Sequence, residues 1–444
     1  MTLGRRELLT RTGIALAAGA IASSAGTTGA VAQGMSALPL TPDTLEDWTA
    51  VRAQFALTED FIHMSAMLIS SHPKPVREAI DEHQRGMDAN PITYLHQNNR
   101  RLQEVARAAA GQYLGISGSD IALTDSTTMG VALVYNGLRL TPDHEILTTE
   151  QDYYVTHEAL RLAAKRTGAK VRKIPLYEHI NGITEDQIVD RIAQAITPAT
   201  RVLALTWVHS STGLKLPLRR IADALNRINV DRDESNRVLL CVDGVHGFGI
   251  EDVTLADLGC DFLMAGCHKW LFGPRGTGIV AGTKRGWDAV LPTIPSFIDG
   301  STWDAWFTGT EPAGPTTGSR MTPGGYKAFE HQWALTQAFS FHQRIGKARV
   351  AARTHELARQ LKEGLAGMPH VVLHTPNLDS LSAGIVSFDV QGLSPSAAVM
   401  RLRERRIIAS VAPYAVPHVR LTPCLANTFQ EIETVLQEVR SLAA

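Results

Sequence analysis

The middle of the chain alternates short apolar runs with segments of helical length, and this pattern restricts the fold more than any other feature. The runs are rich in branched aliphatic residues, which favour β-strands. They are EILTTE (145–150), KVRKIPL (170–176), RVLALTWV (201–208), RVLLCVD (237–243) and FLMAG (262–266). Strands that alternate with helices form βαβ units, so the sequence predicts an α/β fold with a mostly parallel sheet.

The texture of the sequence changes after about residue 291, which indicates a second, smaller domain. Residues 291–325 are rich in Pro, Gly, Thr and Trp and are typical of a long crossing segment. Further on come a helical pattern (326–366), a strand pattern (383–390) and a closing helix (428–442). We therefore predict a large domain over 33–300 and a small α+β domain over 301–444 that includes the crossing segment.

Composition narrows the functional class. The 444 residues are 44% hydrophobic, enough for a large core, and the net charge of −1 argues against nucleic acid or an anionic membrane surface as the partner. The four cysteines form no CxxC pair, and the sequence leaves open whether any two are joined. The sixteen histidines form neither HExxH nor a Cys/His cluster, so no metal site is expected.

The first residues resemble a twin-arginine export signal. Arg5 and Arg6 precede an apolar, Ala/Gly-rich stretch (14–22), and an Ala-x-Ala cleavage pattern ends directly before Gln33. A membrane anchor is the alternative, but the stretch is short for a bilayer and broken by Gly, Ser and Thr. We expect a signal peptide over 1–32, a mature chain from near Gln33, periplasmic localisation and no membrane contact after signal removal.

Lys269 and Asp243 each follow a predicted strand. A lysine is rarely buried without a partner, and one that is buried and poised tends to act as a nucleophile or Schiff-base lysine. An aspartate at the end of a buried strand needs a cationic partner to stay ionised. The two could hold opposite ends of pyridoxal phosphate, the lysine at the aldehyde carbon and the aspartate at the ring nitrogen. A structural salt bridge is the alternative, and the pair alone favours it.

A possible phosphate site lies where a loop enters a predicted helix, in TDSTTMGVALVYNGL (124–138). Ser126, Thr127 and Thr128 supply hydroxyls and free backbone N–H groups at the helix N-terminus. An ordinary N-cap explains the same residues, and the two interpretations are compatible.

Together these motifs resemble the class V aminotransferase superfamily of fold-type I pyridoxal-phosphate enzymes, and in pattern the isopenicillin N epimerase-like branch. The likeness runs from about residue 61 to the end, with the motifs in the family's order. VDGVH (242–246) matches the family's V-D-G-A-Q/H, and HKWLFGPRGTG (268–278) matches H-K-W/L-x-G-P-x-G-x-G. The second of these is the most specific signal in the sequence.

The resemblance implies a role for each residue of these motifs. Lys269 would bind the cofactor's aldehyde carbon and move the substrate's α-proton, and Asp243 would pair with the pyridinium nitrogen. His246 would lie near the ring hydroxyl. The phosphate contacts would come from His268 and from Thr127 or Thr128.

Four further residues take their roles from the same resemblance. Tyr153, in EQDYYVTHEAL (150–160), would stack on the cofactor ring, and Ser210 would approach the cofactor from the end of a strand. Arg420 would clamp the substrate α-carboxylate through a bidentate pair. Thr310 would contact the phosphate of the partner subunit in a homodimer.

The chain departs from the family pattern in two places. Gly266 stands where the family often has a serine, so one phosphate hydroxyl is missing. The segment ASVAPYAVPHVR (409–420) contains no cysteine where the desulfurases carry their catalytic one, and we expect Cys424 to be a buried apolar residue. The absent loop cysteine disfavours persulfide chemistry.

The expected function is that of an exported, homodimeric pyridoxal-phosphate enzyme acting at the α-carbon of an amino acid or of an amino-acid moiety in a peptide metabolite. Similar periplasmic enzymes tailor a secreted siderophore peptide, which makes such tailoring a specific expectation. The motifs leave epimerisation and transamination open. A C–S β-lyase acting on a free amino acid and a cofactor-free binding protein are the alternatives.

Overall fold

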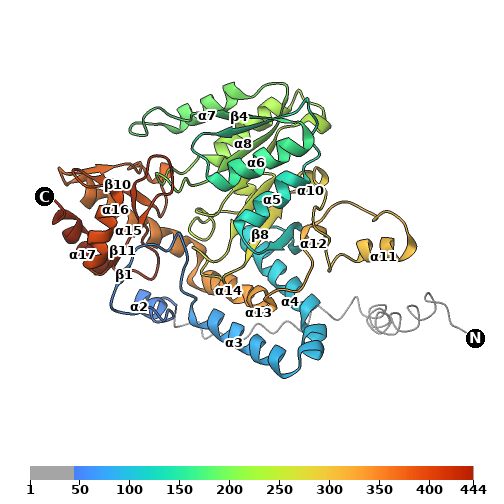
Figure 1. The fold of residues 1–444 in the computed structure, drawn as a ribbon, viewed down its shortest axis with the longest axis horizontal. Coiled ribbons are helices and arrows are strands. Elements are labelled where there is room, and N and C mark those ends of the chain that lie inside the picture. The colour runs from blue at the N-terminus through green and yellow to red at the C-terminus, as the bar shows by residue number, and fades with distance from the viewer. Residues whose placement is uncertain (1–44, 444) are drawn as a thin grey trace, which may run out of the picture. The chain divides into compact units, whose positions relative to one another are not determined.

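The computed structural model describes residues 45–443, so the predicted signal peptide over 1–32 and the start of the mature chain near Gln33 lie outside the described residues. The described chain is built around a seven-stranded sheet and a four-stranded sheet, with helices around both (Figure 1).

The seven-stranded sheet is mostly parallel, as the sequence predicts. Its strands stand in the order β2-β8-β7-β6-β5-β3-β4, and only β8 runs antiparallel to its neighbours. They are β2 (Ile121–Thr124), β3 (Glu145–Thr149), β4 (Lys170–Ile174), β5 (Thr200–Thr206), β6 (Leu239–Asp243), β7 (Phe262–Gly266) and β8 (Gly278–Gly282). The carboxyl ends of the parallel strands therefore meet at one edge, where sites form in sheets of this kind.

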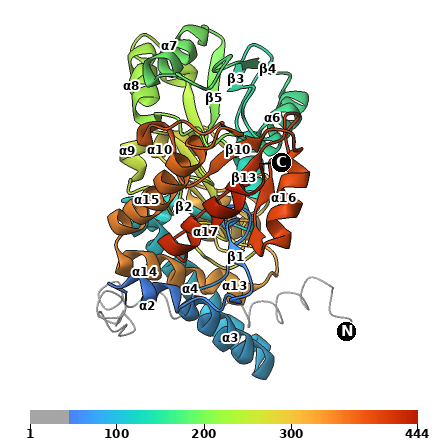
Figure 2. The ribbon, with the colours of Figure 1, turned by 90° about the vertical axis from the view of Figure 1, so that its left-hand side faces the viewer.

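Both faces of the central strands are buried, because their alternate residues enter different hydrophobic cores. In β5, Leu203 and Leu205 belong to one core, and Val202 and Ala204 belong to the other. The first core includes α4 (Pro91–Leu114), α7 (Glu185–Ala195), α8 (Leu218–Asn229) and α9 (Leu255–Leu258). The second includes α5 (Thr127–Gly137), α6 (Tyr154–Thr167) and α10 (Lys284–Asp288). Figure 2 shows the strands between α7 and α8 on one side and α6 on the other.

The four-stranded sheet is antiparallel and belongs to the C-terminal part of the chain. Its order is β12 (Ser410–Val411), β13 (Val419–Leu421), β10 (Val386–Val390) and β9 (Val371–Leu373). The core on one face includes residues of α15 (Lys347–Ala366), α16 (Pro395–Glu404) and α17 (Phe429–Arg440). The predicted strand over 383–390 and closing helix over 428–442 correspond to β10 and α17.

The N-terminal segment completes this C-terminal part. β1 (Ile62–His63) pairs in parallel with β11 (Ile407–Ile408), and Met64 is buried in the C-terminal core. In the described chain this segment begins with α2 (Trp48–Arg52), before β1, and continues into α3 (Lys74–Ala89) after it. The domain limits near residue 300 stay a prediction, but residues 62–64 pack with the small sheet rather than the large one.

The helical pattern over 326–366 contains three helices. They are α13 (Phe329–Trp333), α14 (Leu335–Ile345) and α15. The chain breaks between the last two at Gly346, whose φ of +94° few other residues adopt, so one continuous helix cannot form there. The crossing segment before them carries α11 (Gly300–Thr308) and α12 (Gly318–Met321). None of the helices in residues 45–443 has the length and apolar character needed to cross a bilayer.

Candidate active site

A cavity of about 220 Å³ lies at the carboxyl edge of the large sheet. Nine of the residues predicted from the sequence line it: Thr127, Thr128, Tyr153, Ser210, Asp243, His246, His268, Lys269 and Arg420. They come from separate segments that the fold brings to one edge. The structure thus places these side chains together, while their chemical roles stay predictions.

Lys269 and Asp243 influence each other's charge inside the cavity. Asp243 is the last residue of β6 and is buried, and burial raises the pKa of its carboxyl to about 6. Lys269 comes three residues after β7, and burial lowers the pKa of its amine to about 8, although the charge of Asp243 opposes that shift. At pH 7 roughly a tenth of the amine is therefore uncharged and able to act as a nucleophile or base, far more than for an ordinary lysine.

Asp243 is poorly satisfied by the protein itself. Within residues 45–443 only the backbone N–H of Val245 donates a hydrogen bond to its carboxylate, at 3.1 Å. No lysine or arginine of the described residues forms a salt bridge with it. A buried carboxylate in this state fits a cationic ring nitrogen as its partner.

His246 is neutral, and its tautomer is defined. Burial lowers its pKa well below the usual value, with the charge of Lys269 adding to the shift. The indole N–H of Trp270, which can only donate, lies 3.3 Å from Nδ1 of His246. The proton of the imidazole therefore lies on Nε2, which leaves that nitrogen able to donate to a ring oxygen.

A cradle of polar groups forms where α5 begins. The hydroxyl of Ser126 accepts from the backbone N–H of Met129 as the N-cap, and the hydroxyl of Thr127 accepts from the backbone N–H of Gly266 at 2.7 Å. Nδ1 of His268 is buried without a hydrogen-bond partner, which fits a donor that awaits an acceptor. The α5 N-terminus adds positive potential at the same place.

The structure explains the glycine at position 266. A Cβ atom there would lie 3.0 Å from both the hydroxyl of Thr127 and Cε1 of His268, closer than side chains normally pack. Thr127 and His268 thus occupy the space that a serine side chain would need. Gly266 therefore supplies no hydroxyl for a phosphate, as predicted, and the side chains of Thr127 and His268 lie close to its Cα instead.

Arg420 is a buried cation without a carboxylate partner. Its guanidinium donates to the backbone carbonyls of Ser210 and Val411, each at 2.9 Å, and no salt bridge joins it to an acid of the described residues. Its Nε has no hydrogen-bond partner. Because a buried charge is costly when it is unpaired, this geometry fits an anionic ligand group in the cavity.

Three polar residues in or beside the cavity were not predicted from the sequence. Thr206, the last residue of β5, lines the cavity with an unpartnered hydroxyl. Asp152 fixes the loop before Tyr153 by accepting from the backbone N–H of Thr149 at 2.9 Å and from that of Thr206 at 2.5 Å. Thr206 lies in a predicted strand, and that strand pairs with the one that ends at Asp243. Its place in the apolar run was therefore a sequence signal for Thr206 as a site residue.

Tyr414 is the third of these residues. Its hydroxyl lies 2.8 Å from that of Ser210, and its ring centroid lies 5.8 Å from that of Tyr153. It comes from the short loop before Arg420, so the C-terminal part of the chain closes one side of the cavity. No sequence motif pointed to Tyr414, because it reaches the cavity only through the folded position of this loop.

Two predicted residues lie away from this cavity. Thr310 is exposed just after α11, and its hydroxyl lies 2.9 Å from that of Thr308. Its predicted role in a partner subunit stays a prediction. Cys424 is buried, as expected, and lines a different hollow beside Phe55 and His63. All four cysteines are free and buried.

The residues around the cavity fit pyridoxal phosphate at both ends. Asp243 lacks a cationic partner, His268 has an orphaned nitrogen, and Lys269 has a partly neutral amine in the same cavity. The parallel sheet and this arrangement define a fold-type I pyridoxal-phosphate enzyme.

Comparison with known proteins identifies the family. A family model described as aminotransferase class V matches residues 69–433, and the chain belongs to that family. Pyridoxal 5′-phosphate is accordingly its cofactor, and the chain is a pyridoxal-phosphate-dependent enzyme. The family predicted from the motifs is confirmed.

Relatives within the family carry several activities. The chain is 26% identical to isopenicillin N epimerase of Streptomyces clavuligerus over 409 residues, covering 89% of this chain and 98% of the relative. It is 27% identical to the isopenicillin N epimerase of Amycolatopsis lactamdurans over 408 residues, with the same coverage. A probable cysteine desulfurase of Pyrococcus abyssi is 25% identical over 415 residues, covering 88% of this chain and 96% of that protein.

Solved structures share the fold. A mutant of the cystine C–S lyase C-DES, with glycine covalently linked to its pyridoxal-phosphate cofactor, matches with a TM-score of 0.78 and 23% identity. That match covers 88% of this chain and 98% of the other. The apo cysteine desulfurase of Thermococcus onnurineus matches with a TM-score of 0.75 and 22% identity, covering 89% and 97%. The predicted fold-type I architecture is confirmed.

The lowered pKa of Lys269 gives a direct prediction for the cofactor-free protein. As pH rises, the amine should lose its proton with a midpoint near pH 8, whereas an ordinary lysine does so near about 10.4. Competitive acetylation with acetic anhydride, read by mass spectrometry of the Lys269 peptide, measures the reactive fraction at each pH. A midpoint near the ordinary value would contradict the burial of this amine.

Proposed function

We propose that this enzyme reacts at the α-carbon of an amino acid, or of an amino-acid moiety in a peptide metabolite, and that its chemistry is epimerisation or transamination. The observation that carries the proposal is Arg420, a buried guanidinium without an acidic partner among the described residues, in the cavity that Lys269 and Asp243 line. An α-carboxylate would satisfy it bidentately.

Each of three cavity side chains has a separate role in the proposed reaction. When bound, the cofactor supplies an electron-withdrawing ring that acidifies the Cα–H bond of the amine attached to it. Arg420 holds the substrate carboxylate, and Asp243 keeps a proton on the ring nitrogen by placing a negative charge beside it. Nζ of Lys269 takes the proton from Cα, because its lowered pKa leaves part of it neutral near pH 7.

Two observations bear on the alternatives. The relatives named isopenicillin N epimerase support epimerisation, whereas the structural neighbour named a cystine C–S lyase supports loss of a β-substituent. None of the cysteines, all of which lie within the described residues, lines the cavity. Transfer of sulfur to a cysteine of this chain is therefore disfavoured, and a β-lyase that releases its product directly is the second candidate function.

Deuterium exchange tests the proposal. The cofactor-loaded enzyme is incubated in deuterated water with a panel of L- and D-amino acids and short peptides, and products are read by mass spectrometry and chiral chromatography. Exchange at Cα with an isomer or a keto acid as product supports the proposal. A released thiol assigns the lyase instead, and no exchange with any α-carboxylate substrate contradicts the proposal.

We also propose that the protein is exported by the twin-arginine route, which suits an enzyme that folds around its cofactor before transport. The motif with Arg5 and Arg6 supports it, and modification of a secreted siderophore peptide is the corresponding role. Lysine substitutions at both arginines should retain the protein in the cytoplasmic fraction of a bacterial host. Equal distribution of wild type and variant between cytoplasmic and periplasmic fractions would rule the route out.

We further propose a homodimer, supported by an exposed aromatic patch on α11. Trp306 is 70% exposed and Phe307 is 59% exposed, and their ring centroids lie 5.1 Å apart. Exposed apolar patches of this kind mark protein interfaces.

The aromatic patch makes the dimer testable. Wild type should have twice the mass of one chain by light scattering, and Trp306→Glu should weaken association by about tenfold or more, because it places a charge in an apolar contact. Val230→Glu, at an exposed apolar position at the end of α8, is the matched control and should leave the mass unchanged. A monomeric wild type would contradict the proposal.

A further inference from the structure

A second cluster of polar side chains lies on the small sheet, outside the proposed function. His374 directly follows β9, Asp389 lies in β10, and His418 directly precedes β13. None of the three belongs to the residues that line the active-site cavity. The two histidines lie 15 and 29 residues from Asp389 in the sequence, so no local sequence motif predicted the cluster.

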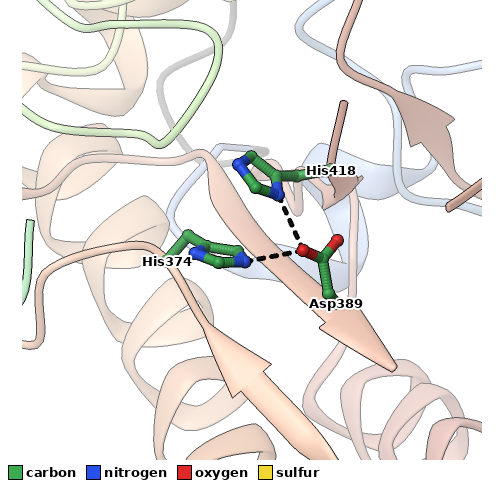
Figure 3. Close-up of side chains that lie close together, drawn as sticks. All are labelled: His374, Asp389 and His418. Atoms are coloured by element: carbon green, nitrogen blue, oxygen red, sulfur yellow. Dashed lines mark hydrogen bonds and ion pairs between the residues drawn. The ribbon is translucent and has the colours of Figure 1, made fainter. Parts of the chain in front are cut away.

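The sheet register brings these three residues together. Phe388 of β10 stands opposite both Leu373 and Val419, so Asp389 lies across from His418 and diagonally from His374, on the same face of the sheet. Nε2 of His374 and Nδ1 of His418 both lie 2.8 Å from the same oxygen, Oδ2 of Asp389. Figure 3 shows the two imidazole rings directed at the carboxylate.

The convergence on one oxygen is more than hydrogen bonding requires. The second oxygen of Asp389, Oδ1, is buried without a donor, although two histidines compete for Oδ2. The two rings lie close together, with centroids 3.9 Å apart. Hydrogen bonds alone would be served better by one histidine on each oxygen, whereas a cation draws several ligand atoms to a single point.

The ligand set and its surroundings suit a divalent transition metal. The three potential ligand atoms lie within 4.8 Å of one another, and no lysine or arginine of the described residues forms a salt bridge with Asp389. Imidazole nitrogens with a carboxylate oxygen suit zinc, which accepts three protein ligands and a water molecule. A tetrahedral ion with bonds of about 2.0–2.1 Å needs ligands about 3.3 Å apart. Each histidine nitrogen must therefore move from the carboxylate oxygen by about half an ångström, and the two nitrogens, which lie within 4.8 Å of each other, must also come to that spacing.

The exposure of the three side chains and the rigidity of the backbone that carries them also suit a metal site. The side chains of His374, Asp389 and His418 are 21%, 31% and 12% exposed, so an ion can enter while the ligands stay partly shielded. All three are carried by strands or by the residues next to them, so the backbone already fixes their spacing.

We propose that His374, Asp389 and His418 form a binding site for a divalent transition metal of the zinc class, with water completing the coordination. The ion would join β9, β10 and β13 on one face of the small sheet. Because β13 also carries Arg420, two residues after His418, the ion would steady the strand that places the proposed substrate-binding arginine. The site does not depend on the proposed reaction.

Zinc binding to the cofactor-loaded, untagged enzyme tests the site after chelating resin has removed metals. Titration with zinc chloride alone should give one ion per chain by calorimetry. Asp389→Asn and His374→Gln should each weaken binding by at least about tenfold, because each removes one ligand. His96→Gln, an exposed histidine on α4 outside the cluster, is the matched control and should bind like wild type.

Two further measurements distinguish this site from zinc binding elsewhere on the chain and from misfolding of the variants. The visible absorbance of the bound cofactor should be the same in wild type and variants, which shows that the variants fold and that zinc does not bind in the active-site cavity. X-ray absorption at the zinc edge should show two imidazole ligands. The proposal would be overturned if the wild type did not bind zinc at about 100 µM. It would also be overturned if wild type and Asp389→Asn bound zinc equally.

Discussion

Replacing Lys269 with alanine should abolish turnover and lower the rate of α-proton exchange by about 10²–10⁴-fold, since the residue supplies the base at Cα. Borohydride should fix the cofactor covalently on the wild-type chain, and peptide mapping should find it at Lys269. The variant should show no such adduct. Mass spectrometry and deuterium exchange measure the two effects independently.

An exposed lysine supplies the control for this experiment. The side chain of Lys74, at the start of α3, is 61% exposed and lies outside the cavity-lining residues. Lys74→Ala should keep both the adduct and the exchange rate of the wild type. A Lys269→Ala enzyme that still exchanged the α-proton at the wild-type rate would show that another group is the base.

Replacing Arg420 with methionine should lower kcat/KM for amino acids by about 100-fold or more. The substitution removes two charge-assisted hydrogen bonds to the substrate carboxylate, each of about 1.5–3 kcal/mol. The effect should shrink to a few-fold for the matching amino-acid amides, which lack the carboxylate. Steady-state kinetics on acid and amide pairs therefore separates recognition of the carboxylate from a general loss of structure.

Arg353 is the matched control for a buried arginine. It is buried on α15, donates to the backbone carbonyl of Asn427 at 3.0 Å, and lies outside the cavity-lining residues. Arg353→Met should lower the melting temperature but leave the ratio of acid to amide kinetics unchanged. Equal loss for acid and amide in Arg420→Met would show that Arg420 does not bind the carboxylate.

The strand pattern led to Asp243 and Lys269, whereas the roles of Tyr153, His246 and Arg420 were predicted from the resemblance to the class V family. The apolar runs before Asp243 and Lys269 identified two neighbouring strands, and a parallel sheet puts their carboxyl ends at one edge. The helix entry at Ser126 was marked by its hydroxyl residues. These signals are local, so they could be found without knowing the rest of the fold.

The features that were missed depend on contacts between distant segments. Tyr414 reaches the cavity only because the loop before Arg420 folds over Ser210, and the cluster around Asp389 exists only when three strands pair in one register. The interruption at Gly346 was missed because the apolar pattern continues through it, whereas the backbone conformation does not.

The pairing of β1 with β11 ties residues near the start of the described chain to residues more than three hundred positions later. Contacts of such long sequence separation slow folding, because a large loop must close before they can form. A ribosome synthesises the partner strand long after residues 62–64, so a nascent chain carries Met64 without its final neighbours until residues 407 and 408 have been made. Quality-control proteases and chaperones would therefore meet this segment during synthesis, and a message truncated before residue 407 would leave it permanently without a partner.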